Sequence, residues 1–256
     1  MKVEPSVVSH FTASVERYSD PPPGPGDFVL RAFEPYSGQA LRVLELGCGT
    51  GHRLEGLARD HPGFRLFGLD ITPVMVQTAR RVRPAAVSFM IGDCLATPFA
   101  DGQFEAVILY DVLHHLVSGT KAESNLLRAA GLKEIVRLLA RGGRIVMEEV
   151  CVNAGWRAGW IHAASRLIAR LHLSIPALHI HTDVVLNFFT LEELEAAFAG
   201  CDLQVSAREV TKFPGLGAWI STFGDTTYHV RCVLERSHIR NTDDIEPMAG
   251  SISQTV

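Results

Sequence analysis

Short apolar runs alternate with helical segments along the chain from Leu41 onward. Five of these runs are rich in β-branched residues and have the length of buried strands: Arg42–Leu46, Arg65–Leu69, Val87–Ile91, Phe104–Tyr110 and Arg144–Val150. The intervening segments repeat their apolar residues at helical spacing, most clearly from Glu123 to Leu139. Strands separated by helices predict βαβ units, and therefore a parallel sheet with right-handed crossovers.

The end of the pattern predicts a different strand pairing. A helix that begins after Thr190 and closes at Gly200 is followed by two strand-like runs, Leu203–Val210 and Thr226–Leu234. We expect these two runs to pair antiparallel at one edge of the sheet. The expected fold class is α/β: a seven-stranded, mostly parallel sheet with helices on both faces and an antiparallel last strand.

Three segments fall outside this alternation. Helical spacing from Ser6 to Tyr18 and from Phe28 to Phe33, with the break Pro21-Pro22-Pro23 between them, predicts an N-terminal helical lid. Apolar residues at helical spacing after Val150 predict a helical insertion that follows the fifth strand. The predicted division is a lid at 1–40, a main domain at 41–236 with a substrate-capping insertion at 151–186, and a flexible tail at 237–256.

Composition narrows the class of protein. Of 256 residues, 47% are hydrophobic and 20% are charged, which is typical of a globular chain with a real core. A net charge of −4 gives no reason to expect a nucleic-acid partner. Five cysteines are scattered singly and no apolar run reaches about 20 residues, so we expect a cytoplasmic protein with reduced thiols and no membrane span.

A glycine-rich loop is the strongest chemical motif. In VLELGCGTG a strand runs directly into Gly47-x-Gly49-x-Gly51 and then into a helix, which brings backbone amides close to a ligand. Asp70 ends the next strand, where a carboxylate can accept both hydroxyl groups of a ribose, and Asp93 follows the third strand, where it can accept the amine of adenine. Together these positions predict a pocket for an adenosine-containing ligand.

In these motifs the chain resembles the class I S-adenosylmethionine-dependent methyltransferases, and within them the small-molecule group that includes ubiquinone and menaquinone methyltransferases. The resemblance covers residues 10–150 well and 188–235 loosely, and it extends to TPFADGQFEAVILYDVLHHL around the fourth strand. It implies a Rossmann-like fold, S-adenosyl-L-methionine as the cofactor and S-adenosyl-L-homocysteine as its product. The cofactor contacts that it implies are Tyr18 in the lid, Glu45, Gly47, Cys48, Gly49 and Gly51 at the loop, Asp70 with Ile71 at the ribose, Asp93 with Cys94 at adenine, and Tyr110 at the sulfonium.

Three residues are candidates for catalysis. His114 and His115 follow the fourth strand, where a methyl acceptor would lie, and a neutral imidazole can take a proton near pH 7. Glu149 at the end of the fifth strand is the second candidate, acting alone or with a histidine. Each also has a structural interpretation, as a packed histidine or a solvated acid.

The expected function is methyl transfer to a small, apolar or aromatic metabolite, on oxygen or carbon. The alternative is a protein that binds the cofactor but catalyses a different reaction, such as cyclisation, or regulates. A dehydrogenase is disfavoured because its fingerprint is Gly-x-Gly-x-x-Gly. No metal is expected, since His172, His179, His181 and Asp183 match no zinc spacing.

The apolar stripe of the insertion serves equally well as a lid, as the interface of a homodimer or as a membrane-surface helix, and we favour the lid. Its arginines, Arg157, Arg166 and Arg170, could pair with an acidic substrate or a lipid headgroup, or simply be solvated.

Overall fold

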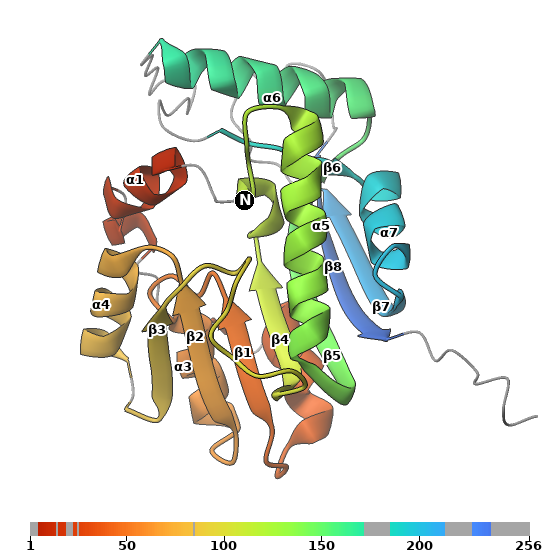
Figure 1. The fold of residues 1–256 in the computed structure, drawn as a ribbon. Coiled ribbons are helices and arrows are strands. Elements are labelled where there is room, and N and C mark those ends of the chain that lie inside the picture. Colours follow the sequence, from red (N-terminus) through yellow and green to blue (C-terminus); the bar gives the residue numbers. More distant parts are fainter. Residues whose placement is uncertain are drawn as a thin grey trace, which may run out of the picture.

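A computed structural model describes residues 5–13, 15–18, 23–24, 26–83, 85–171, 185–212 and 227–236. Within these residues one sheet of eight strands forms the centre of the molecule (Figure 1). The strand order is β3-β2-β1-β4-β5-β8-β7, and the short strand β6 pairs with β5 beside this path. The strands are β1 (Arg42–Leu46), β2 (Arg65–Asp70), β3 (Val87–Ile91), β4 (Phe104–Tyr110), β5 (Leu139–Val152), β6 (Phe189–Thr190), β7 (Leu203–Lys212) and β8 (Thr227–Arg236).

The predicted α/β fold is confirmed. Strands β1 to β5 pair in parallel, whereas β8 runs antiparallel to both β5 and β7. Two details differ from the prediction. β5 is longer than Arg144–Val150 because it begins directly at the end of the preceding helix, and the two-residue β6 adds an eighth strand that is too short to produce a periodic pattern.

Helices cover both faces of the sheet. One apolar cluster joins the sheet to α5 and α7, and a second joins its other face to α2, α3 and α4. Figure 1 shows α5 crossing one face while α3 lies behind the strands. The helices are α1 (Pro5–Ala13), α2 (Phe28–Phe33), α3 (His52–Asp60), α4 (Pro73–Val82), α5 (Lys121–Leu138), α6 (Gly155–Arg170) and α7 (Leu191–Ala199), with short 3₁₀ turns η1 (Val15–Tyr18), η2 (Glu34–Tyr36) and η3 (Leu113–His115).

Helix ends follow the capping signals in the sequence. Thr190 forms a capping box with Glu193 at the start of α7, and Thr120 forms another with Glu123 at the start of α5. In each box the hydroxyl accepts from a backbone N–H that has no partner within the helix. Pro73 occupies the first turn of α4, where its missing N–H costs nothing.

The N-terminal region is not a single lid. The segment predicted as one helix from Ser6 to Tyr18 is divided into α1 and η1. Helix α2 lies in the core. Its large apolar residues, Phe28, Val29, Leu30 and Phe33, are buried in the cluster that joins α3 to the sheet. Asp27 caps α2 by accepting from the N–H groups of Val29 and Leu30. Helix α1 is placed as a cover would be, because Val7 packs with Val117, which follows η3, and with Val185.

The carboxyl ends of the parallel strands lie at one edge of the sheet. The glycine loop follows β1 at this edge, Asp70 ends β2, and the turn η3 follows β4. Helix α6 lies across the same end, beyond the tips of the strand arrows in Figure 1. Open α/β sheets bind ligands at this edge, so the predicted site residues converge there. In the part of the chain described, no helix is both long and apolar enough to cross a bilayer.

The packing of α2 leads to a first prediction. Phe33 is fully buried, and its ring meets Phe64 edge-on. Phe33→Ala should lower the free energy of unfolding by about 3–5 kcal/mol, as truncation of a buried aromatic residue does. Urea denaturation followed by circular dichroism measures this loss. Phe11→Ala in the half-buried α1 is the control and should cost less; equal, small losses in both variants would mean that α2 is a detachable lid after all.

Candidate active site

The glycine loop after β1 depends on backbone conformations that favour glycine. Gly47, Gly49 and Gly51 all have positive φ. A Cβ atom on Gly47 would lie 2.6 Å from a methyl group of Val112, and one on Gly51 would lie 2.5 Å from the Phe89 ring. At Gly49 nothing lies within 4 Å of the same position. Two glycines are therefore required by packing, whereas Gly49 leaves open space beside the loop.

Asp70 holds this loop in place. One of its carboxylate oxygens accepts from the N–H of Gly49 at 2.9 Å, and the other accepts from the N–H of Thr72 at 2.8 Å. Burial raises the pKa of Asp70, and the two amide hydrogen bonds act against that rise. Each carboxylate oxygen can accept a second hydrogen bond, so a diol can still bind. The open space at Gly49 and the acceptor beside it fit the predicted cofactor.

Glu45 and Tyr110 meet beneath the loop, on the face of the sheet covered by α3. The guanidinium of Arg53 lies 3.9 Å from a Glu45 oxygen, and its central carbon is 3.1 Å from the centre of the Tyr110 ring. Burial raises the pKa of Glu45 to about 8, although Arg53 opposes the shift. Burial and the neighbouring Glu148 raise the pKa of Tyr110. Both side chains are engaged with Arg53, and their contact with the cofactor stays a prediction.

The other predicted cofactor residues differ in burial and in the groups that they contact. The Cys48 side chain is buried in the core, so only its backbone can face a ligand. Asp93 accepts from the N–H of Leu95, which shapes the turn after β3. Cys94 and Ile71 are half-buried at the same edge. The Tyr18 side chain lies outside the described part of the chain.

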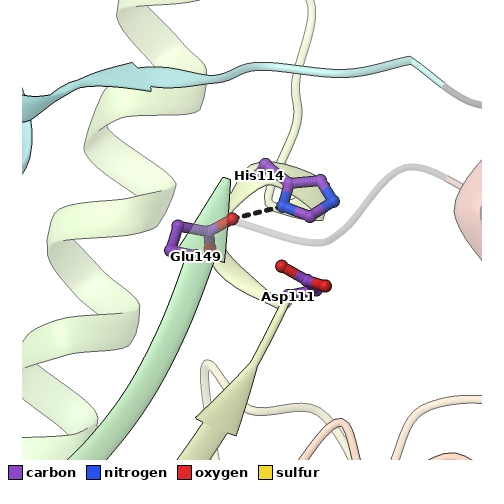
Figure 2. A group of neighbouring side chains, drawn as sticks. All are labelled: Asp111, His114 and Glu149. Carbon is purple, nitrogen blue, oxygen red and sulfur yellow. Dashed lines mark hydrogen bonds and ion pairs between the residues drawn. The ribbon is translucent and has the colours of Figure 1, made fainter. Parts of the chain in front are cut away.

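His114 and Glu149 form a buried pair at the ends of β4 and β5. Glu149 comes from β5, His114 from η3, and Figure 2 shows the imidazole Nδ1 directed at the Glu149 carboxylate. Because a carboxylate only accepts, we assign the Nδ1 proton to His114, which donates it to Glu149 Oε1. The same carboxylate accepts from the N–H of Leu113 at 2.9 Å and of Val150 at 3.0 Å. In this tautomer Nε2 is left as a proton acceptor.

Asp111 completes the group, and sequence reasoning missed it. Its carboxylate faces the histidine from the end of β4 (Figure 2), and one of its oxygens is buried without a partner among the described residues. Burial raises the pKa of Asp111 to about 6, with His114 opposing the shift. Its backbone has a φ of 54°, uncommon for a residue other than glycine. The available signal was an acid directly after the fourth strand, as Asp70 ends the second.

The two histidines have different surroundings. Burial acts to lower the pKa of His114, but the Glu149 carboxylate, its hydrogen bond and Asp111 outweigh burial and raise it. The pKa of His115 is lowered well below its usual value by burial and by His114 and His10. The His115 Nδ1 atom is buried without a hydrogen-bond partner in the described region, and its ring meets Phe11 of α1 edge-on. Of the two, only His114 has a carboxylate to hold its ring.

The same three residues could in principle hold a metal ion, because one ligand atom from each of Asp111, His114 and Glu149 lies within 4.8 Å of the others. The Nδ1 atom of His114 is already bonded to Glu149, so the arrangement suits a proton better than a cation. The histidines His172, His179 and His181 and the acid Asp183 lie outside the described residues.

The comparisons with known proteins find similarity to methyltransferases. Residues 44–147 match the family described as "Methyltransferase domain". A demethylmenaquinone methyltransferase of Thermus thermophilus is 37% identical over 111 residues, which is 42% of this chain and 46% of that protein. A demethylmenaquinone methyltransferase of Deinococcus radiodurans is 26% identical over 198 residues, covering 74% of this chain and 78% of that protein. The chain matches less than half of the length of the Thermus relative.

The fold comparison extends to the whole domain. The chain superposes on a solved complex between the Haloferax volcanii Trm112 methyltransferase activator and the putative methyltransferase, with a TM-score of 0.58. The superposition covers 91% of this chain and 96% of that one at 19% sequence identity. Such a likeness shows a shared fold, and it confirms the Rossmann-like architecture that the motifs predict.

The loop geometry leads to a prediction for Asp70. Asp70→Ala removes the acceptor for the Gly49 amide and for a ribose, so binding of S-adenosyl-L-methionine should fall below detection in titration calorimetry. Asp101→Ala, which removes an exposed acid far from the loop, is the matched control and should bind as the parent does. If Asp70→Ala keeps the parent's affinity and melting temperature, Asp70 has no part in the site.

Proposed function

We propose that this chain is an S-adenosylmethionine-dependent methyltransferase that transfers a methyl group to a small, apolar or aromatic metabolite, on oxygen or carbon; the match of residues 44–147 to the methyltransferase-domain family supports this. The observation that carries the proposal is the His114–Glu149 pair at the edge of the sheet where the glycine loop ends. Val112 connects the two parts, because its side chain packs against Gly47 two residues before His114.

Within this proposal the residues divide the work between binding and proton transfer. The cofactor, when bound, supplies an activated methyl group. The protein orients the two reactants and provides the electrostatic environment of the reaction. Asp70 and the loop amides orient the nucleoside portion. His114 Nε2 accepts the proton of the methyl acceptor, while Glu149 keeps the ring in the tautomer that leaves Nε2 free and stabilises the imidazolium that forms.

A base at this position favours some acceptors over others. A phenol, a hydroxyl or an acidic carbon must lose a proton during methylation, whereas an amine can attack as it stands. The names of the demethylmenaquinone methyltransferases support a quinone-type acceptor for this chain as well. In its reduced, dihydroquinone form a ring of that kind carries hydroxyl groups and a nucleophilic carbon, so both oxygen and carbon are sites for methylation.

Replacement of the base should separate catalysis from binding. His114→Ala should lower kcat by about 10²–10⁴-fold, the usual contribution of a positioned base, with little change in cofactor affinity. His115→Ala, the neighbouring histidine without a carboxylate partner, should have a much smaller effect. Release of S-adenosyl-L-homocysteine with a dihydroquinone acceptor measures turnover and separates methyl transfer from any reaction that leaves the cofactor intact. Equal rates in the parent and His114→Ala would refute the assignment.

The pKa of His114 gives the reaction a pH dependence with a definite sign. Only the neutral imidazole accepts a proton, so kcat/KM should fall as the pH drops through the raised pKa of His114. Glu149→Gln and Asp111→Asn each remove a carboxylate that raises this pKa, so the acidic limb of the profile should move to lower pH. Glu105→Gln, at the opposite end of β4, should leave the limb in place. If the acidic limb does not move in Glu149→Gln and Asp111→Asn, the limb reports the titration of a group other than His114.

A further inference from the structure

Helix α6 exposes a stripe of large apolar side chains. Trp156, Trp160, Leu167 and Leu171 are between 47% and 65% exposed. They are spaced by four, seven and four residues, so at about 100° per residue they fall within roughly 60° of the helix circumference. Scattered apolar residues are normal on a protein surface, but an aligned set of two tryptophans and two leucines is characteristic of a contact surface.

The helix is anchored by its opposite face. Ala158, Ile161 and His162 are buried beneath it, against the chain at 185–188. His162 Nδ1 lies 3.2 Å from the carbonyl oxygen of Leu186, whose own N–H donates to Ser165 Oγ at the same distance. Arg166 donates to the carbonyl of Ser118 at 2.7 Å. These contacts fix the rotation of α6 about its axis, so the stripe faces away from the sheet.

The charged side chains of α6 itself have a single sign. From Gly155 to Leu171 there is no aspartate or glutamate, but there are three arginines. Arg170 is exposed beside the stripe, and Arg157 lies with its central carbon 5.0 Å from the Trp156 ring. This local excess stands in a chain whose net charge is −4. The stripe is therefore apolar in its centre and basic at its border. Such a surface complements a partner whose interior is apolar and whose outer layer is anionic.

We propose that α6 docks on the surface of a bilayer that contains anionic lipids. Trp156 lies at the level of the headgroups, Leu167 and Leu171 reach the acyl chains, and the exposed Arg170 meets the lipid phosphates. A symmetric contact between two copies of this stripe would bring arginines of like charge together, which disfavours a homodimer through this face. The proposal requires no methyl transfer and stands apart from the proposed function.

Docking through α6 would place the active-site edge of the sheet near the bilayer. Ala169 of α6 packs with Val117, which follows η3, and with Val185. The turn that carries His114 is therefore close to the C-terminal end of α6. An apolar acceptor dissolved in the lipid would then reach the site without crossing bulk water, so the two proposals are compatible although neither depends on the other.

Vesicle co-sedimentation of the full chain tests the proposal. The parent should bind vesicles of phosphatidylglycerol and phosphatidylcholine, and should bind vesicles of phosphatidylcholine alone at least about tenfold more weakly. The triple variant Trp156→Ser, Leu167→Ser, Leu171→Ser should weaken binding to the mixed vesicles by at least about tenfold. Arg170→Gln, which removes an exposed cation beside the stripe, should weaken it by about fivefold at low salt.

A matched control separates this site from exposed apolar surface in general. Leu126 on α5 is 60% exposed, as much as the residues of the stripe, so Leu126→Ser should bind as the parent does. Melting temperatures should change little, because Trp156, Leu167, Leu171, Arg170 and Leu126 are all exposed. Equal binding of the parent and the triple variant, or no preference for phosphatidylglycerol, would overturn the proposal. A parent dimer in light scattering that the triple variant dissociates would instead assign the stripe to a second copy of the chain.

Discussion

The buried carboxylate of Glu149 is the interaction on which the geometry of the site depends. It is fully buried, and an acid without hydrogen bonds in such a place would cost several kcal/mol. Three donors offset that cost: the His114 imidazole and the backbone N–H groups of Leu113 and Val150. Two of these donors belong to the turn after β4. The end of β5 therefore fixes the conformation of η3, and with it the direction of the histidine ring.

Parallel pairing explains why the remaining residues gather around this pair. Each of the first four strands delivers its last residues, or the turn that follows, to the same edge, so positions some 20 residues apart in the chain become neighbours. Asp70 closes the glycine loop from β2, and Val112 packs on Gly47 from the turn after β4. The loop and the histidine turn consequently form one packed unit, in which a shift of one part displaces the other.

Much of this arrangement could be predicted from the sequence, since strand periodicity and glycine spacing are local signals. Seven of the eight strands and the glycine loop were predicted in this way, and the three catalytic candidates were chosen by their place after predicted strands. The choice between His114 and His115 could not be made, because adjacent residues in a 3₁₀ turn point in different directions that only the packing decides. Asp111 was missed for a similar reason: its importance comes from its neighbours in space.

The error at the N-terminus has a related cause. Helix α2 follows the proline break and precedes Leu41, where the alternation of strands and helices begins, which suggested a separate lid. Its apolar residues are instead part of the core beside α3. A short helix shows too few turns for its pattern to reveal whether it covers a ligand or the sheet.

The tautomer and pKa of His114 test the central claim most directly, and heteronuclear NMR of ¹⁵N-labelled imidazoles measures both. The account predicts a protonated Nδ1 and an unprotonated Nε2 in the neutral ring, with a pKa above the usual value of about 6.5 that falls in Glu149→Gln. A proton on Nε2, or a pKa that is below the usual value and indifferent to Glu149, would contradict the assignment of His114 as the base.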